Sequence, residues 1–155
     1  SRRAPKGAGT TVDDEIDIAI VVNPLPTPNL IIKPIGQDVV TLFIGQKDAD
    51  AKTLIYDPAL AQSQSLVQQL AKRKIFFERV IETGNLELVS QLVHRGVGVG
   101  ILPTRVAHAQ SDRILRPFLE DGPIFTDRIC VVYQRELTEL AAGKILIECV
   151  KSCLS

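Results

Sequence analysis

The 155-residue sequence has no long apolar run, no net charge, and few cysteines and histidines. No run approaches the roughly 20 apolar residues of a membrane-spanning helix, and no secretory signal peptide opens the chain. Eighteen basic and eighteen acidic residues cancel, so no overall field attracts nucleic acid or an anionic membrane. These absences argue against a membrane protein and against a strongly basic nucleic-acid-binding domain.

Cysteine and histidine are too scarce for the usual structural cross-links. Three cysteines are an odd number and do not make a disulfide framework. Cys130 lies in an apolar run and is expected to be a small buried hydrophobe, whereas Cys149 and Cys153 are four residues apart on an expected helix and could face one another. With only His94 and His108 beside them, the sequence favours no zinc site. We therefore expect no metal and no cofactor, and a reducing cytoplasm as the compartment.

The composition is that of a globular protein. Hydrophobic residues make up 45% of the chain and charged residues 23%, and 155 residues are enough to bury a core. This length fits one ordinary domain or two small lobes. Residues 1–14 are polar and aperiodic, and we expect them to form a disordered or irregular leader.

The segment Thr83–Pro103 carries the clearest pattern in the chain. It begins with an amphipathic helix, because apolar residues recur every three or four positions, namely Leu86, Leu88, Val89, Leu92 and Val93. Asn85 stands at the N-cap position, and Gly96 follows the helix where a left-handed residue ends it. The residues after Gly96 form a continuous apolar run, which is typical of a buried parallel strand. The polar turn Thr83-Gly84-Asn85 then lies at the carboxyl end of a strand, where ligands bind in open α/β sheets.

Gly96, Gly98 and Gly100 are similar in spacing to a nucleotide-binding loop. Such a loop needs its glycines between a strand and the following helix, so that the helix N-terminus faces the phosphates. Here the glycines follow a helix and precede a strand. We interpret them as a turn and a tightly packed strand rather than as a phosphate site.

The other elements follow from the same periodicities. Ile16–Val22 is apolar at every position except Asp17 and is expected to be a central parallel strand, buried on both faces. A proline-dense loop follows Asn23. We expect further strands at 30–33, 39–44, 53–56, 75–81, 114–118 and 128–133, and helices at 63–72, 105–110 and 138–154. At the first of these helices we expect a buried face of Leu66, Val67, Leu70 and Ala71, with Gln62, Gln64, Gln68 and Gln69 exposed to solvent.

The order of these elements predicts two lobes. Residues 53–102 follow the order strand, helix, strand, helix, strand, which implies a parallel βαβαβ sheet. The strands outside this block require a second lobe. We assign residues 15–47 and 128–155 to the first lobe and residues 48–127 to the second. A crossing near 45–52 and a ligand site between the lobes complete this prediction.

Three segments together resemble one known family. They are the strand Asp17-Ile18-Ala19-Ile20, the turn Thr83-Gly84-Asn85 that opens a helix, and the segment Val93-His94-Arg95-Gly96-Val97-Gly98-Val99-Gly100-Ile101-Leu102-Pro103. This combination is similar to the effector-binding domain of LysR-type transcriptional regulators, in which the corresponding patterns are "D-apolar-A-I" and "V-x-x-G-x-G-apolar-x-x-L-P". The resemblance covers nearly the whole chain from Glu15 onward.

The resemblance implies an α/β fold of the type II periplasmic-binding-protein kind, with two hinged Rossmann-like lobes that hold a small-molecule inducer between them. It implies that the first lobe is incomplete in this chain, because the family's first strand and first helix have no counterpart before residue 15. It also implies that DNA is bound only through a winged helix-turn-helix that is absent from this sequence. Family effector domains pair side by side, so a homo-oligomer is expected.

The resemblance carries ligand-binding roles onto five positions. Asn23 lies at the end of the first strand, Thr83, Gly84 and Asn85 lie at a helix start, and Tyr56 lies at a neighbouring strand end. A hydroxyl, a carboxamide and free N–H groups at a helix N-terminus suit an anionic or polar ligand. The alternative is that Thr83 and Asn85 only cap their helix.

Three classes of function fit these observations. The leading hypothesis is a ligand-sensing regulatory domain that binds an inducer and performs no chemistry. The second is a solute-binding protein of the same fold, although the unpaired cysteines and the missing signal peptide disfavour export. The third is an enzyme on this fold. Because no Ser-His-Asp or Cys-His set stands in a helpful context, and lone acids such as Asp57 and Glu82 are usually solvated, we expect no catalytic residue.

Overall fold

The structure, a computed structural model, describes residues 18–46, 48–109 and 114–154. The leader predicted at 1–14 lies outside these residues. The chain divides into two compact units: unit 1 runs up to Gln37 and resumes at Asp127, and unit 2 is Asp38–Thr126. The unit boundaries lie at 37/38 and 126/127. The boundaries predicted from the sequence were 47/48 and 127/128, and the residues of the predicted crossing, 45–52, belong to unit 2.

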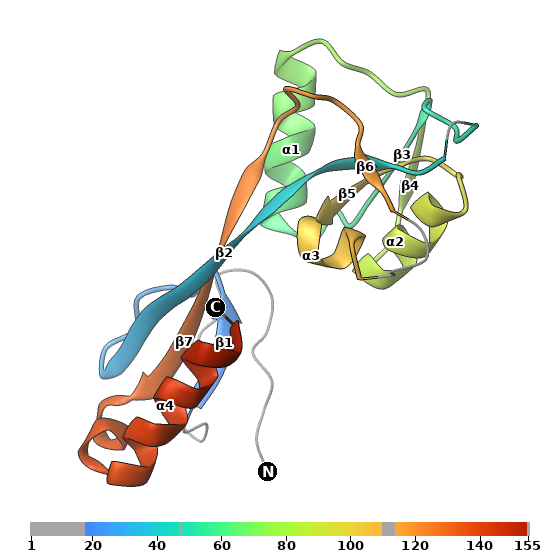
Figure 1. Ribbon diagram of the computed structural model, residues 1–155. Helices are drawn as coiled ribbons and strands as arrows, with labels where there is room; N and C mark the ends of the chain where they lie inside the picture. The colour runs from blue at the N-terminus through green and yellow to red at the C-terminus, as the bar shows by residue number, and fades with distance from the viewer. Residues whose placement is uncertain (1–17, 47, 110–113, 155) are drawn as a thin grey trace. The chain divides into compact units, whose positions relative to one another are not determined.

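One mixed sheet supplies strands to both units (Figure 1). Its hydrogen-bonded order is β1-β7-β2-β5-β3-β4, and β6 pairs with β2. The strands are β1 (Ile18–Val22), β2 (Leu30–Ile44), β3 (Thr53–Tyr56), β4 (Arg79–Glu82), β5 (Val99–Pro103), β6 (Arg116–Pro117) and β7 (Phe125–Gln134). The helices are α1 (Ala61–Lys72), α2 (Leu86–His94), α3 (Thr104–Ala107) and α4 (Ala141–Leu154), with a 3-10 helix at Arg135–Glu139. β2 and β7 each span a boundary between the units.

Unit 2 contains the predicted parallel βαβαβ block. β3 pairs in parallel with β4 on one side and with β5 on the other, and α1 and α2 are the connections. Successive residues of a strand point to opposite faces of the sheet. Leu54 accordingly clusters with Leu66 and Leu70 of α1, whereas Ile55 clusters with Val89 of α2. The two helices therefore cover opposite faces of the sheet.

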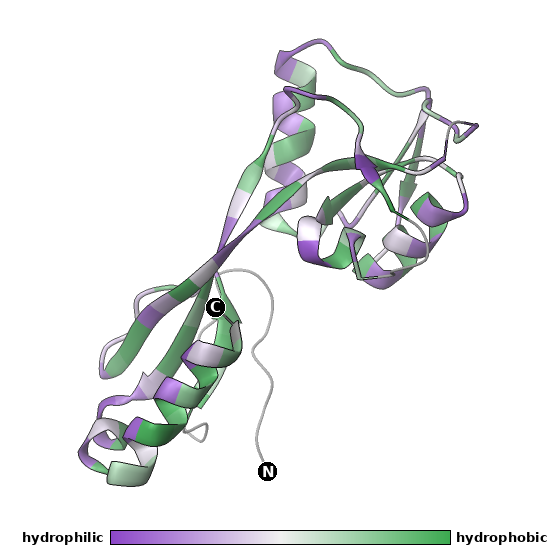
Figure 2. Ribbon diagram, viewed as in Figure 1, coloured by the Kyte–Doolittle hydropathy of each residue, from purple (hydrophilic) through white to green (hydrophobic). Residues whose placement is uncertain are grey.

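β5 is the buried strand that the sequence predicted. All five of its residues are buried, and Figure 2 shows the sheet of unit 2 as largely apolar. β5 lies between β2, to which it is antiparallel, and β3, to which it is parallel. A strand with neighbours on both sides and helices over both faces has no solvent-facing positions, which explains its unbroken apolar sequence.

Gly96 ends α2 in the conformation expected from the sequence. Its φ is 78°, which is the left-handed region. The Gly96 N–H donates to the Val93 carbonyl at 3.0 Å, and the Val97 N–H donates to the Leu92 carbonyl at 3.0 Å. Together these two bonds form a Schellman motif, the common C-terminal cap of a helix.

The next two glycines are packing sites. A Cβ on Gly98 would lie 2.6 Å from the carbonyl oxygen of Thr53, and a Cβ on Gly100 would overlap the side chains of Val93 and Val89. The backbone just before β5 therefore approaches β3, and the backbone within β5 approaches α2, more closely than any side chain would allow. This confirms the interpretation of the glycine segment as a turn and a tightly packed strand.

β1 differs from its prediction. It is antiparallel to β7 and stands last in the sheet order. Val21 is its one buried residue, and Ile20 is 49% exposed. The prediction of a central parallel strand that is buried on both faces is therefore wrong. A continuous apolar run specifies neither the direction of the neighbouring strand nor the cover on each face.

Two strand boundaries also differ from the prediction. β2 is one strand of 15 residues, where the sequence predicted two strands separated by Pro34. Pro34 is exposed, and proline fits a strand where no partner needs its N–H. β4 is shorter than the predicted strand at 75–81 because the first residues of that range belong to the C-terminal end of α1. Lys74 adopts a φ of 58°, and the Ile75 N–H donates to the Leu70 carbonyl at 3.0 Å.

The number of helices agrees with the sequence prediction, but their bounds and buried residues differ from it. Leu66 and Leu70 of α1 are buried as predicted, but Ala71 is exposed and Gln62, predicted to be exposed, is buried. Gln62 is in the same row as Leu66 and Leu70 because residues four apart share a helix face. The predicted helix at 138–154 divides into the 3-10 helix and α4, and the predicted strand at 114–118 is reduced to β6. α3 is shorter than the helix predicted at 105–110.

Candidate functional site

The structure brings four of the five predicted ligand-binding residues to one edge of unit 2. Tyr56 ends β3, and the turn Thr83-Gly84-Asn85 follows β4. Because β3 and β4 are parallel neighbours, their carboxyl ends lie at the same edge of the sheet. The Thr83 N–H donates to the Tyr56 carbonyl at 3.1 Å. Asn23, the fifth residue, belongs to unit 1.

Tyr56 presents its hydroxyl at this edge. The hydroxyl donates to Oε1 of Glu82 at 3.4 Å. Burial raises the pKa of Tyr56, and the negative charge of Glu82 and the hydrogen bond to it raise this pKa further. The phenol is therefore a neutral donor at physiological pH. An anionic ligand at the Tyr56 hydroxyl would compete with Glu82 for the proton that the hydroxyl donates.

Asn85 caps α2, as its position before the helix predicted, and a ligand-binding role for it stays a prediction. Its backbone is extended, and its Oδ1 accepts the N–H of Glu87 at 2.8 Å and the N–H of Leu88 at 3.3 Å. Glu87 places a carboxylate in the first turn. The cap therefore occupies two N–H groups of α2 that an incoming anion would otherwise use, and Glu87 offsets part of the helix dipole.

The N-terminus of α1 also lies at this edge, although it was not among the ligand-binding residues predicted from the sequence. Its N-cap residue is Leu60, no side chain caps it, and its first turn holds no acidic residue. An uncapped helix N-terminus carries unsatisfied N–H groups and a partial positive charge. In the first turn, Ser63 is 1% exposed, and its Oγ has no hydrogen-bond partner among the described residues. The only signal in the sequence was a leucine where Ser, Thr, Asp or Asn is usual.

Asp57 stands between β3 and α1 and shapes the loop that joins them. Its Oδ1 accepts the N–H of Ala59 at 3.0 Å, and its carbonyl accepts the N–H of Leu60 at 3.4 Å. Such a bond from an aspartate to the backbone two residues ahead is an Asx turn. The loop holds the start of α1 close to the end of β3, so the α1 N-terminus and Thr83 share one edge of the sheet.

Asn23 uses its carboxamide within unit 1. Its φ is 53°, a left-handed conformation that asparagine tolerates better than most residues. Its Oδ1 accepts the Arg128 N–H at 2.8 Å, and its Nδ2 donates to Oδ1 of Asp127 at 3.0 Å. These bonds join the end of β1 to β7. A ligand contact by Asn23 stays a prediction.

Among residues 18–46, 48–109 and 114–154, no group of three or more His, Cys, Asp or Glu side chains could hold a metal ion. The three cysteines are free, with Cys130 buried and Cys149 and Cys153 exposed. In the same part of the chain, no helix has the length and apolar character needed to cross a membrane.

A cavity of about 200 Å³ lies elsewhere in unit 2. It is lined by the second half of α1, by the segment that precedes β4, and by single residues of β3 and β4, namely Leu54, Val67, Leu70, Ala71, Ile75, Phe76, Phe77 and Val80. Its lining is apolar, and none of the five predicted ligand-binding residues contributes to it. This cavity is therefore a different feature from the polar edge at Tyr56 and Thr83.

Comparison with known proteins is consistent with this geometry. The family described as the LysR substrate binding domain matches residues 11–154. The apo regulatory domain of HypT from Salmonella typhimurium superimposes with a TM-score of 0.69 at 12% identity, covering 90% of this chain and 75% of that chain. The Synechocystis PCC6803 CcmR regulatory domain in complex with 2-PG has a TM-score of 0.67 at 12% identity, covering 92% and 75%. No curated protein matches the chain in sequence.

A larger regulator shows the same similarity over part of its length. Vibrio fischeri DarR in complex with DNA has a TM-score of 0.69 at 13% identity, covering 91% of this chain and 52% of that one. The chain thus spans about half of DarR. At such identities the similarity shows the fold alone. That fold is the α/β fold of the type II periplasmic-binding-protein kind, as the sequence predicted.

Proposed function

Because the chain belongs to the family of LysR substrate-binding domains, we propose that the ligand it senses is a small anion, bound in part at the edge of unit 2 formed by the start of α1 and the turn Thr83-Gly84-Asn85. The domain is a ligand-sensing regulatory domain of a LysR-type regulator. A regulatory domain of this kind binds an effector and passes a change of conformation to the rest of the protein, so binding is its only chemical task.

The observation that carries the proposal is the uncapped N-terminus of α1. The helix has 12 residues, so its dipole is fully developed, no side chain caps it, and its first turn holds no acidic residue. A carboxylate, sulfate or phosphate would accept from the first-turn N–H groups and would gain from the partial positive charge. A neutral ligand of the same size would gain only the hydrogen bonds.

Thr83 and Gly84 suit the other side of such a ligand. Thr83 is half-buried and carries a hydroxyl, and its N–H is already used by Tyr56. A Cβ on Gly84 would meet nothing within 4 Å, so the backbone there is open. A ligand at this edge would therefore find one side-chain donor and an accessible backbone next to the α1 N-terminus.

We further propose that the domain is not an enzyme, that it acts in the cytoplasm, and that DNA is bound by another part of the regulator. His94, at the end of α2 away from Asn85, is 5% exposed, and the His108 ring packs edge-on against Phe43 with centroids 5.9 Å apart. Asp57 is used by the loop before α1. These residues are thus committed to the fold rather than to a nucleophile or base at the edge. Two solved structures support this separation of ligand binding from DNA binding. The CcmR regulatory domain is in complex with 2-PG, and the longer DarR is in complex with DNA.

An NMR titration tests the proposal. Acetate, sulfate and phosphate are added to the ¹⁵N-labelled chain, with acetamide as the neutral control. We expect saturable shifts of the amides of 60–64 and 83–86 with the anions and smaller shifts with acetamide. Asn85→Asp keeps the capping oxygen but adds a negative charge at the edge, so it should weaken anion binding, whereas Glu87→Lys should strengthen it. Equal binding of acetamide, or shifts confined to other parts of unit 2, would refute the anion site.

A further inference from the structure

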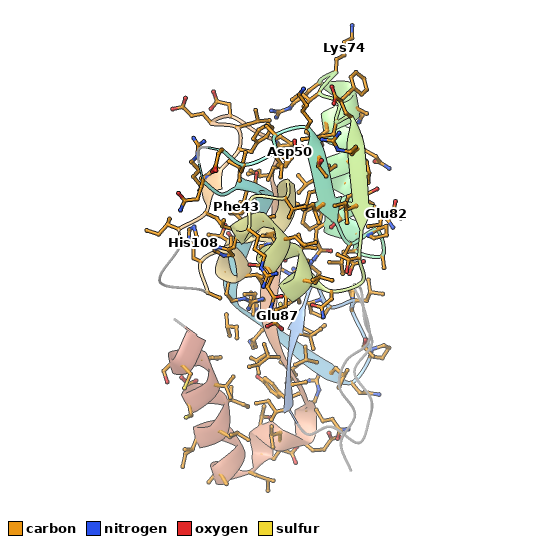
Figure 3. The ribbon with its side chains drawn as sticks, turned by 90° about the vertical axis from the view of Figure 1, so that its right-hand side faces the viewer. Phe43, Asp50, Lys74, Glu82, Glu87 and His108 are labelled. Carbon is orange, nitrogen blue, oxygen red and sulfur yellow. The ribbon has the colours of Figure 1, made fainter. Side chains whose placement is uncertain are left out.

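Glu82, the last residue of β4, lies on the face of the sheet that α1 covers. Val80 lines the apolar cavity together with Val67 and Leu70 of α1, so the Val80 side chain points to this face. Because alternate residues of a strand share a face, the Glu82 side chain points to the same side. Figure 3 shows Glu82 at the end of β4. Only residues 57–60 separate β3 from α1, so the helix also begins at this end of the strands.

Tyr56 stands beside Glu82 on that face. The two residues are paired in the register of β3 and β4, and the Tyr56 side chain packs against the cluster that contains Leu66 and Leu70 of α1. The Tyr56 hydroxyl donates to Oε1 of Glu82 at 3.4 Å. A phenol oxygen that donates its proton to one group can still accept a hydrogen bond from another. Glu82 and Tyr56 therefore offer two acceptors, a carboxylate and a phenol oxygen.

The charge of Glu82 is not neutralised by a cation in the described part of the chain. The basic residues at the start of β3 and β4 bind other carboxylates, because Arg79 lies 2.8 Å from Asp50 and Lys52 lies 4.0 Å from Glu78. A purely anionic ligand at this edge would gain from the α1 N-terminus and would be repelled by Glu82.

Ser63 is an independent sign that a ligand group binds at the start of α1. Ser63 precedes Leu66 by three residues and Leu70 by seven, so it belongs to the row of α1 that faces the sheet. Helical side chains tilt toward the N-terminus, so its hydroxyl is directed to the first turn. This hydroxyl is buried and has no partner among the described residues. Buried polar groups in folded proteins have hydrogen-bond partners, and a ligand carboxylate at the first turn would supply one.

We propose that the ligand is a small zwitterion, such as an amino acid, whose carboxylate binds at the start of α1 and whose ammonium group binds Glu82 and Tyr56. This inference rests on the proposed anion site and adds the second charge of the ligand. The ammonium group donates to the Glu82 carboxylate in a charge-assisted hydrogen bond and to the phenol oxygen of Tyr56. Glu82, which repels a simple anion, thus becomes the group that selects the zwitterion.

Three probes of similar size separate the two charges of the ligand. Glycine carries both, acetate carries only the carboxylate, and glycinamide carries only the ammonium group. Each is titrated into the ¹⁵N-labelled chain at low salt, where exposed charges are least screened, and the amides of 60–64 and 83–86 report binding. We expect glycine to bind about twofold to fivefold more tightly than acetate, which is the range of one exposed ion pair, and glycinamide to bind most weakly.

Two variants assign each charge to its partner. Glu82→Gln should remove the advantage of glycine and leave acetate bound at least as tightly as in the parent, because the repulsion is gone. Ser63→Ala should weaken glycine and acetate alike without lowering the stability of the fold, since this hydroxyl has no partner to lose. Glu78→Gln is the matched control, because it removes an exposed carboxylate just before β4 and should leave both affinities unchanged.

The outcomes distinguish this inference from the anion site on which it rests. Equal affinities of glycine and acetate in the parent chain, or an advantage of glycine that persists in Glu82→Gln, would overturn the zwitterion and leave the anion site intact. Glycinamide bound as tightly as glycine would also overturn it, since the carboxylate would then contribute nothing. If neither acetate nor glycine shifts the amides of 60–64, the anion site and the zwitterion both fail.

Discussion

Arg79 of β4 donates from Nη2 to Oδ2 of Asp50 at 2.8 Å and joins the turn after β2 to the edge of the parallel sheet. The same carboxylate accepts the Lys52 N–H at 2.7 Å and the Thr53 hydroxyl at 2.9 Å. The Arg79 guanidinium also donates from Nε to Oγ1 of Thr53 at 3.1 Å. Asp50 thus holds the start of β3 and the start of β4 together.

This set of bonds predicts a change of stability in acid. The Lys52 N–H, and after it the Arg79 guanidinium and the Thr53 hydroxyl, lower the pKa of Asp50 from 3.8 to about 2. A depressed carboxyl pKa stabilises the folded state above the unfolded pKa, and this stabilisation is lost as pH falls through the folded pKa. Asp50→Asn should therefore be less stable than the parent at neutral pH, and the difference should shrink between about pH 4 and pH 2.

Urea unfolding at several pH values measures this difference. Asp48→Asn is the matched control, because it removes an exposed carboxylate from the same turn. Its difference from the parent should be small at every pH. A pH-independent gap for Asp50→Asn would show that the carboxylate charge does not contribute.

Gly96→Ala should destabilise unit 2 through the backbone alone. A Cβ at Gly96 would meet Ala49 at 3.5 Å, which is ordinary contact, so there is space for it. The φ of 78° is the obstacle, because alanine in a left-handed conformation costs about 1–2 kcal/mol. Gly96→Asn should lose less, since asparagine tolerates this region. Unfolding free energies rank the three chains, and equal losses for alanine and asparagine would contradict the backbone explanation.

The sequence predicted elements whose signals are local. Asn85 before an amphipathic run and Gly96 after it identify both ends of α2 without knowledge of any other residue. β5 was also predictable, because its burial on every side leaves an unbroken apolar run. Even in α2, however, Leu88 is 42% exposed while Ser90 and His94 are buried. The spacing of the apolar residues locates the helix, but the elements packed against the helix determine which of its faces is buried.

The features that the sequence did not predict depend on residues that are distant in the chain. The direction of β1 is set by β7, and the carboxamide of Asn23 bonds Asp127, 104 residues away. No local pattern contains such a pairing. At the candidate site, the turn Thr83-Gly84-Asn85 was predictable because a polar turn interrupts two apolar elements. The start of α1 was not, because its importance comes from the absence of a cap at Leu60.

Gly100→Ala should destabilise by overpacking. Its Cβ would overlap Cγ2 of Val93 and lie 3.0 Å from Cγ1 of Val89, and both valines are fully buried. Extra volume in a packed core costs about 1–3 kcal/mol. Val93→Ala removes the overlapping methyl groups, so the double variant should be more stable than the sum of the single changes predicts. Gly36→Ala, where a Cβ would meet nothing within 4 Å, is the control and should be close to neutral. Strict additivity of Gly100→Ala and Val93→Ala would contradict direct overlap.

The capping role of Asn85 and the proposed anion site can be separated by two variants at one position. Asn85 is exposed, so its replacement loses little buried surface, and any large effect on stability must come from the bonds to Glu87 and Leu88. Asn85→Ala should lower the free energy of unfolding by about 0.5–2 kcal/mol. Asn85→Asp keeps an acceptor and places a negative charge at the helix N-terminus, so it should be as stable as the parent or more stable.

The ranking of variants by phosphate affinity should differ from their ranking by stability. Asn85→Asp should lose affinity for phosphate because of charge repulsion, although its fold is intact, whereas Thr83→Val should lose about 0.5–1.5 kcal/mol of binding free energy through one hydrogen bond. Denaturant unfolding and phosphate titration of the same three variants supply both rankings. If Asn85→Asp binds phosphate as tightly as the parent while Asn85→Ala is destabilised, Asn85 is a cap alone. Phosphate would then have to bind away from this turn, because an added charge inside the site cannot leave the affinity unchanged.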